Sequence, residues 1–256
     1  SIACQLGRAG CVEQLVAAGA DVSSTLPGEE TLLMTACRTG NPDIVRHLLK
    51  HKAQINATER RGQTALMWAA AEGHADVMDL LIKANADVKA STARGFTAMM
   101  FAAREGHIDA VKRLLSAGVD VNHAMSPKAK GNRTPREGTS ALQLAVESGH
   151  FELGLMLVQE GADPNDQRSG FTPLHALSWV RKPDRGENSK GDPSPRGSGR
   201  LTSLEFVREL VHSGADVNTR LNKGASGRAV LSKRGATPFL LAAKTCDVPF
   251  MKLLLE

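Results

Sequence analysis

Histidines are the residues of this chain with the most obvious capacity for chemistry. His47 and His51 are four residues apart, so on a helix they would share one face and could both ligate a metal ion, but no third ligand is evident in the sequence. We therefore interpret this pair as exposed and metal-free. His74, His107 and His150 each occupy the same place in a repeating pattern, which favours a structural hydrogen-bonding role over catalysis.

Neither the cysteines nor the known catalytic signatures indicate an enzyme. The chain has four cysteines, Cys4, Cys11, Cys37 and Cys246, with neither C-x-x-C spacing nor a dense framework. We interpret them as free thiols that serve as small core residues, the alternative being a redox or disulfide role for Cys4 and Cys11. The chain also lacks G-x-x-x-x-G-K-[ST], H-E-x-x-H, G-x-S-x-G and C-x-x-C-H. The sequence therefore predicts a protein that is not an enzyme and uses no cofactor, metal or small-molecule substrate.

The histidines belong to a period that runs along the chain. Thr31, Thr64 and Thr97 are 33 residues apart, and one glycine per copy keeps the same step. A period of this length is typical of repeat proteins, in which each unit packs only on its neighbours. Such a stack presents an elongated surface, which suits another macromolecule better than a closed catalytic pocket would.

One copy, residues 61–90, shows how the repeat is built. Thr64 stands where a helix N-cap belongs, so it predicts a short first helix, which Gly73 ends. A second helix is expected from about residue 75 to 84, with apolar residues on one face. Two helices of this length cannot bury a core alone, so they become stable only when they stack on other copies.

These copies resemble ankyrin repeats over nearly the whole chain. The T-P-L-H motif of that family is matched by the four residues that begin at Thr64, Thr97, Thr172 and Thr237, and its G-A-D-V-N motif by the segments that begin at Gly19, Gly118, Gly161 and Gly214. The last copy departs from the pattern, since Cys246 replaces the turn glycine and Asp247 the turn histidine. The resemblance implies an all-α repeat solenoid, an ankyrin-type stack of about seven helix-turn-helix units with hairpin loops between units.

We expect a single ankyrin repeat domain over residues 1–256, with three connections enlarged by insertions. The units are expected at about 1–27, 28–60, 61–93, 94–124, 138–167, 168–219 and 235–256. The insertions are residues 125–137, 181–200 and 220–234. Both ends look cut within a repeat, so we also expect a fragment of a longer protein.

The insertions carry the positive charge of the chain. The whole sequence has a net charge of +5, while the three insertions carry +3, +3 and +5, which leaves −6 on the repeats. We expect these loops, including Lys223, Arg228, Lys233 and Arg234, to attract an acidic protein surface, an anionic polymer or phosphates. The alternative is that they are solvated insertions that the fold tolerates. Nucleic acid is not expected, because no aromatic residue is interleaved with the basic ones.

The family resemblance also implies where a partner would bind. In ankyrin proteins, contacts usually come from residues around the turn before the T-P-L-H motif and from the two residues that close the first helix. The matching positions here, together with the basic loop residues, are Arg60, Arg61, Gln63, Arg94, Phe96, Arg104, Glu105, Phe171, Trp179, Lys223, Arg228, Lys233, Arg234 and Lys244. Alternatively, Phe96, Phe171 and Trp179 only pack against local turns, and we expect Trp68 and Phe101 to be partly buried packing residues.

The leading hypothesis is a protein-interaction scaffold that holds a macromolecular partner through its concave face and basic loops, as part of a longer chain or assembly. The alternatives are a rigid structural spacer, or the regulatory region of an enzyme whose catalytic domain lies outside this sequence. No apolar run reaches the ~18 residues of a membrane helix. The compartment stays open: cytoplasmic is the default for a chain without evident disulfides, and an exported or periplasmic location is the alternative.

Overall fold

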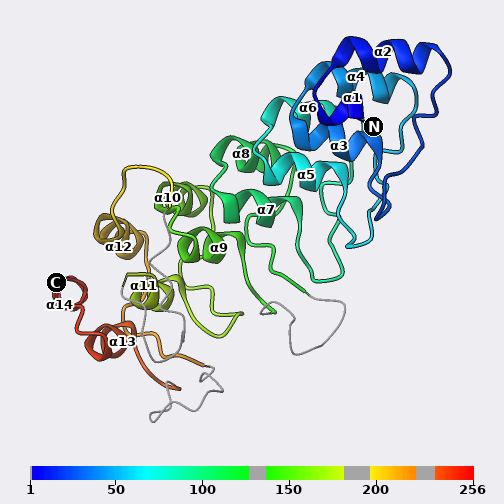
Figure 1. Cartoon of the computed structure of the whole chain (residues 1–256). Helices are drawn as coiled ribbons and strands as arrows, with labels where there is room; N and C mark the ends of the chain where they lie inside the picture. Colours follow the sequence, from blue (N-terminus) through cyan, green and yellow to red (C-terminus); the bar gives the residue numbers. More distant parts are fainter. Residues whose placement is uncertain (1, 127–136, 182–196, 223–233) are drawn as a thin grey trace. The chain divides into compact units, whose positions relative to one another are not determined.

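A computed structural model of the chain describes residues 2–126, 137–181, 197–222 and 234–256. Within these residues the regular structure is helical, with fourteen short helices, and the only β-type pairings are three isolated bridges that close hairpins. The helices come in seven consecutive pairs (Figure 1). The prediction of an all-α repeat fold of about seven helix-turn-helix units is confirmed. No helix in the described part of the chain has the length and apolarity that a membrane crossing requires.

The two helices of each pair alternate along the chain. The first helices are α1 (Ile2–Gln5), α3 (Leu32–Thr39), α5 (Ala65–Ala71), α7 (Ala98–Glu105), α9 (Ala141–Glu147), α11 (Pro173–Arg181) and α13 (Pro238–Lys244). The second helices are α2 (Ala9–Ala17), α4 (Pro42–Lys50), α6 (Ala75–Lys83), α8 (Ile108–Ser116), α10 (Phe151–Gln159), α12 (Ser203–His212) and α14 (Val248–Leu253).

The first helices begin where the periodic threonine predicts. The hydroxyl of Thr64 accepts a hydrogen bond from the backbone N–H of Met67 at 3.3 Å. Since the first N–H groups of a helix have no partner within it, such a cap fixes the helix start. The same cap starts α3, α7, α9, α11 and α13, from Thr31, Thr97, Ser140, Thr172 and Thr237.

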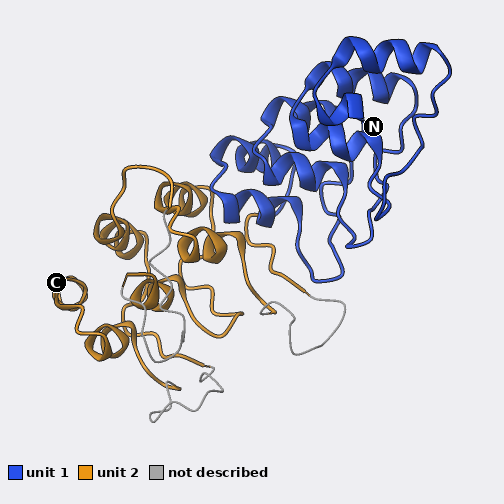
Figure 2. Cartoon of the chain, in the orientation of Figure 1, with its two compact units in different colours: residues 1–120, 127–134 blue, residues 121–126, 135–256 orange. Residues whose placement is uncertain are grey.

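The chain divides into two compact units (Figure 2). Unit 1 holds α1 to α8 within residues 1–120, and unit 2 holds α9 to α14 within residues 121–126 and 135–256. Inside each unit the first helices pack side by side in one layer and the second helices in another. Fully buried residues such as Leu66, Met100 and Phe206 form the core of the units. A single domain across the whole chain stays a prediction.

The described ends of the insertions show where each leaves the repeats. Met125 donates its N–H to Thr139 O at 2.8 Å, and Leu221 donates its N–H to Ala236 O at 2.9 Å, so the first and third insertions extend hairpins that link consecutive pairs. The second begins at Arg181, the last residue of α11, and ends before α12. Residues 127–136, 182–196 and 223–233 lie outside the described residues.

Candidate partner-binding surface

Three consecutive hairpins of unit 1 contact one another. The N–H of Arg60 donates to Gly28 O at 3.0 Å, which joins the first hairpin to the second. Gly62, at a φ of +81°, faces the third hairpin so closely that a Cβ there would lie 3.4 Å from Thr92 Cα. Adjacent hairpins follow the spacing of the helices that they connect, so matching positions on them are separated by about the distance between packed helix axes, roughly 8–10 Å.

The tips of the second and third hairpins carry three arginines. Arg60, Arg61 and Arg94 are exposed, and no ion pair engages their guanidinium groups among the described residues. The adjacent carboxylate of Glu59 instead accepts the backbone N–H groups of Arg61 at 2.8 Å and Gln63 at 3.0 Å, which closes the turn. Two hairpin tips in contact thus present three cationic groups.

An arginine and two aromatic rings follow the third hairpin. The Cζ atom of Arg104 lies 5.6 Å from the ring centroid of Phe96 and 5.4 Å from that of Phe101, and the two ring centroids are 5.3 Å apart. Arg104 also forms an ion pair with Glu105 at 2.8 Å. Phe101 is buried and Phe96 is half-buried. Cation–π contacts of this kind hold a guanidinium in one orientation.

A second stack joins two repeats of unit 1, and its arginine was not among the predicted site residues. Cζ of Arg38, at the end of α3, lies 5.4 Å from the ring of Trp68 on α5. Glu30 holds this arginine at 3.3 Å and accepts a hydrogen bond from the hydroxyl of Thr35 at 2.9 Å. Arg38 could have been found from sequence, because it follows its capping threonine by the same interval as Arg104.

We call Arg38, Arg60, Arg61, Trp68, Arg94, Phe96 and Arg104 the arginine–aromatic surface of unit 1. It combines the two residue types that are most enriched in binding hot spots, arginine and large aromatics. Five of the seven were predicted as binding residues, and Trp68, expected as partly buried packing, is half-buried. Two further predicted residues of unit 1 border it, Gln63, half-buried, and Glu105, exposed and paired with Arg104.

The predicted binding residues of unit 2 that the structure describes differ in their burial. Phe171 is only 7% exposed, and its ring meets the half-buried ring of Trp179 edge-on, with centroids 4.8 Å apart. Burial thus favours the alternative interpretation of Phe171, packing against its own repeat. Arg234 and Lys244 are exposed. The remaining three, Lys223, Arg228 and Lys233, lie outside the described residues.

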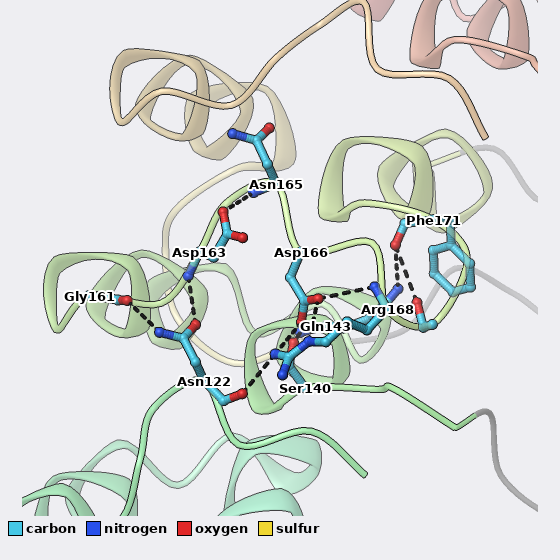
Figure 3. Close-up of polar contacts among 10 residues, drawn as sticks. Asn122, Ser140, Gln143, Gly161, Asp163, Asn165, Asp166, Arg168 and Phe171 are labelled. Carbon is cyan, nitrogen blue, oxygen red and sulfur yellow. Dashed lines mark hydrogen bonds and ion pairs between the residues drawn. The ribbon is translucent and has the colours of Figure 1, made fainter. Parts of the chain in front are cut away.

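A polar network in unit 2 lines a depression of about 550 Å³ (Figure 3). Arg168 grips the buried carboxylate of Asp166 with Nε at 2.8 Å and Nη2 at 2.9 Å, and Nη2 also donates to Asn122 O at 2.7 Å. Burial acts to raise the pKa of Asp166, but the hydrogen bonds and charge of Arg168 outweigh it, so this pKa lies below its ordinary value. These groups satisfy one another, which identifies the network as structural.

Asparagines at matching positions of the turns, Asn122 in D-V-N and Asn56 in Q-I-N, join successive hairpins in both units. The side chain of Asn122 accepts from Asp163 N at 2.9 Å and donates to Gly161 O at 2.9 Å. Asn56 accepts likewise from Asp87 N at 2.9 Å. These hydrogen bonds reach the next repeat, so a single copy of the motif does not reveal them.

The histidines are placed for structure rather than chemistry. Nε2 of His74 lies 3.1 Å from Arg38 O, and Nε2 of His107 lies 3.0 Å from Ala71 O, so each ties its repeat to the previous one. This confirms the predicted hydrogen-bonding role for both. The rings of His47, on α4, and His51, which follows its last residue, are 4.7 Å apart; His51 is exposed, but His47 is half-buried. No group of three or more potential ligands surrounds a metal position in the described ranges.

Two of the cysteines are core residues, as predicted, and two are not. Cys4 and Cys37 are buried, and burial raises the pKa of both thiols, most strongly for Cys37. Cys11 and Cys246 are exposed, which corrects the prediction that all four fill core positions.

Comparison with known proteins agrees with this geometry. The family model described as "Ankyrin repeats (3 copies)" matches residues 1–92, 59–125 and 87–168, which together cover well over half of the chain. The chain belongs to the ankyrin repeat family. It is 34% identical over 107 residues to the mouse (Mus musculus) B-cell lymphoma 3 protein homolog, a match that covers 41% of this chain but only 19% of that protein.

Among solved structures, the chain is similar to the human ASB11 ankyrin repeat domain. The TM-score is 0.73 at 22% sequence identity, and the match covers 99% of this chain and 94% of that domain. At this identity the likeness shows the fold. Ankyrin repeats are generally protein–protein interaction modules, and their fold is typically a non-catalytic scaffold.

Proposed function

We propose that this ankyrin array is a scaffold that binds a protein partner with an acidic surface, and that the arginine–aromatic surface of unit 1 is the principal contact. The observation that carries the proposal is the set of exposed guanidinium groups of Arg60, Arg61 and Arg94 on two contacting hairpin tips. Exposed cations that are not held in ion pairs raise the positive potential of a surface and attract an acidic partner before contact.

The stacked arginines strengthen the proposal. Glu30 and the ring of Trp68 fix Arg38, while Glu105 and two phenylalanines fix Arg104. A guanidinium that is already ordered loses less side-chain entropy when it forms a bidentate hydrogen bond with a carboxylate. These two arginines would supply specificity at close range, and the three on the hairpins would supply the attraction.

The test compares two triple variants with the same change in net charge. Variant R60E/R61E/R94E reverses the hairpin tips, while the control K50E/K83E/K112E reverses exposed lysines on α4, α6 and α8. Affinity capture at low and high salt, followed by mass spectrometry, provides a partner, which is then purified. We expect the hairpin variant to lower the association rate at low salt by roughly tenfold or more, and the control to stay near wild type. Equal rates for all three proteins would refute the proposed surface.

The basic insertions are tested separately. Variant K223Q/R228Q/K233Q/R234Q removes four positive charges from the third insertion, which carries no acidic residue. If these loops steer the partner, the association rate falls and its dependence on salt weakens. An unchanged rate would show that the loops are spacers.

A further inference from the structure

The cations of the arginine–aromatic surface repeat with the step of the array. Arg61 and Arg94 hold the same position in consecutive repeats, and a Cβ on Gly62 in the first hairpin of the two would come within van der Waals contact of Thr92 in the other. Arg38 and Arg104 also share a position, two repeats apart. With a step of roughly 8–10 Å, the positions of Arg61 and Arg94 are separated by about that distance, and those of Arg38 and Arg104 by about twice it.

A ligand that meets these cations must present carboxylates on one side with the same spacing. In a β-strand, side chains on one side are roughly 6.6 Å apart at i and i+2 and roughly 13 Å apart at i and i+4, and neither distance matches the 8–10 Å spacing of the repeats. In a polyproline II helix, with three residues per turn and a rise of about 3.1 Å per residue, every third side chain lies on one side at about 9 Å. The polyproline II spacing matches the repeat.

An α-helical ligand could also place carboxylates about 10.5 Å apart, at positions i and i+7. Helix docking, however, relies on an apolar groove that receives the apolar face of the helix. In α5 and α7 the large aliphatic residues are buried, with Leu66 and Met67 each 1% exposed and Met99 2% exposed. The half-buried rings of Trp68 and Phe96 each have a guanidinium over them. The apolar side chains at these positions are therefore covered, which disfavours a docked helix.

We infer that the arginine–aromatic surface binds an extended acidic segment of its partner in the polyproline II conformation, with a carboxylate at every third residue. This inference rests on the proposed function and adds the shape of the ligand to it. Each carboxylate accepts two hydrogen bonds from one guanidinium, in the bidentate arrangement that arginine favours.

The test uses two labelled synthetic peptides of identical composition. One consists of four Glu-Pro-Pro triplets; the other places its four glutamates in two adjacent pairs, at the ends of the same proline run. A helical alanine-rich peptide with glutamates seven residues apart is the third probe. We expect the triplet peptide to bind at least tenfold more tightly than either at low salt, and R61E/R94E to abolish the difference.

Two outcomes would overturn the inference: equal affinity for the two proline peptides, which would mean that charge alone is recognised, or tighter binding of the helical peptide. If a purified acidic partner binds the wild type and not R60E/R61E/R94E while the peptides show no preference, the proposed function stands and this inference fails. If neither the partner nor any peptide depends on these arginines, both fail.

Discussion

An ion pair between Arg181 and Asp247 ties the last helix pair to the one before it. Arg181 ends α11, and Asp247 precedes α14 at the position where other copies carry the turn histidine. Nε of Arg181 lies 2.8 Å from Asp247 Oδ2, and Nη2 lies 3.0 Å from Oδ1. The arginine side chain is 14% exposed and the aspartate 0% exposed, so removing one partner leaves the other charge buried.

We predict that R181M lowers the free energy of unfolding by about 3–5 kcal/mol, the usual cost of breaking a buried pair. The loss should concentrate in unit 2, because the arginine also bonds Ser203 on α12 and lies 5.7 Å from the ring of Phe250 on α14. Since repeat arrays can open from their ends, urea unfolding should be combined with hydrogen exchange, in which α14 should lose protection first.

The matched variant is R181M/D247N. Asparagine removes the buried charge and can keep the cap, since Asn41 caps α4 at the corresponding position by accepting from Asp43 N at 3.0 Å and Ile44 N at 3.2 Å. The double variant should therefore recover most of the loss. A cost below about 1 kcal/mol for R181M, or a double variant no more stable than R181M, would refute the reasoning.

Three further changes test other parts of the structure. Burial lowers the pKa of His175, so the unfolded chain takes up the proton first and stability should fall as pH drops below about 6.5. H175Q should reduce that loss, measured by urea unfolding at pH 7.5 and 5.5, because glutamine does not titrate. Glutamine can also keep the bond to the next hairpin, since Gln143 makes the equivalent bond to Phe171 O at 3.3 Å. An unchanged pH dependence would exclude His175 as its source. Cys11 and Cys246 should react with a thiol reagent in the native protein, and Cys4 and Cys37 only after unfolding, so four fast thiols would contradict the buried positions. E152A removes the carboxylate that accepts hydrogen bonds from Leu201 N, at 3.2 Å, and from Arg200 N, so trypsin should cleave after Arg200 several-fold faster. E209A, at an exposed glutamate, is the control. Equal cleavage rates in the two variants would show that Glu152 does not hold residues 200 and 201.

Local signals explain how much of the fold was predictable. Thr64 caps its helix through a bond that spans three residues, and Gly40 and Gly106 end α3 and α7 in the left-handed conformation, at φ values of 73° and 82°. These interactions depend on residues close in sequence, and the period repeats them. Most of the arginine–aromatic surface was predictable for the same reason, since matched positions of successive copies carry it.

Contacts between repeats were less accessible to sequence reasoning. Arg38 meets Trp68 thirty residues further along, and Arg181 meets Asp247 across an insertion. Phe171 and Phe96 share one position in the motif, but Phe171 is buried and meets Trp179 while Phe96 is half-buried. A repeat pattern predicts the position of a residue within its own repeat, but it does not predict which side chain of the next repeat lies opposite.

Photocrosslinking from the hairpin tips tests the central claim most directly. A photoreactive amino acid is placed at Gln63, beside the arginines of unit 1, or at Lys112 on α8 as a control, and each protein is irradiated with the purified acidic partner. The account predicts crosslinks from position 63 that disappear in R60E/R61E/R94E and at high salt, and none from position 112. Efficient crosslinking from position 112 with none from position 63 would contradict it.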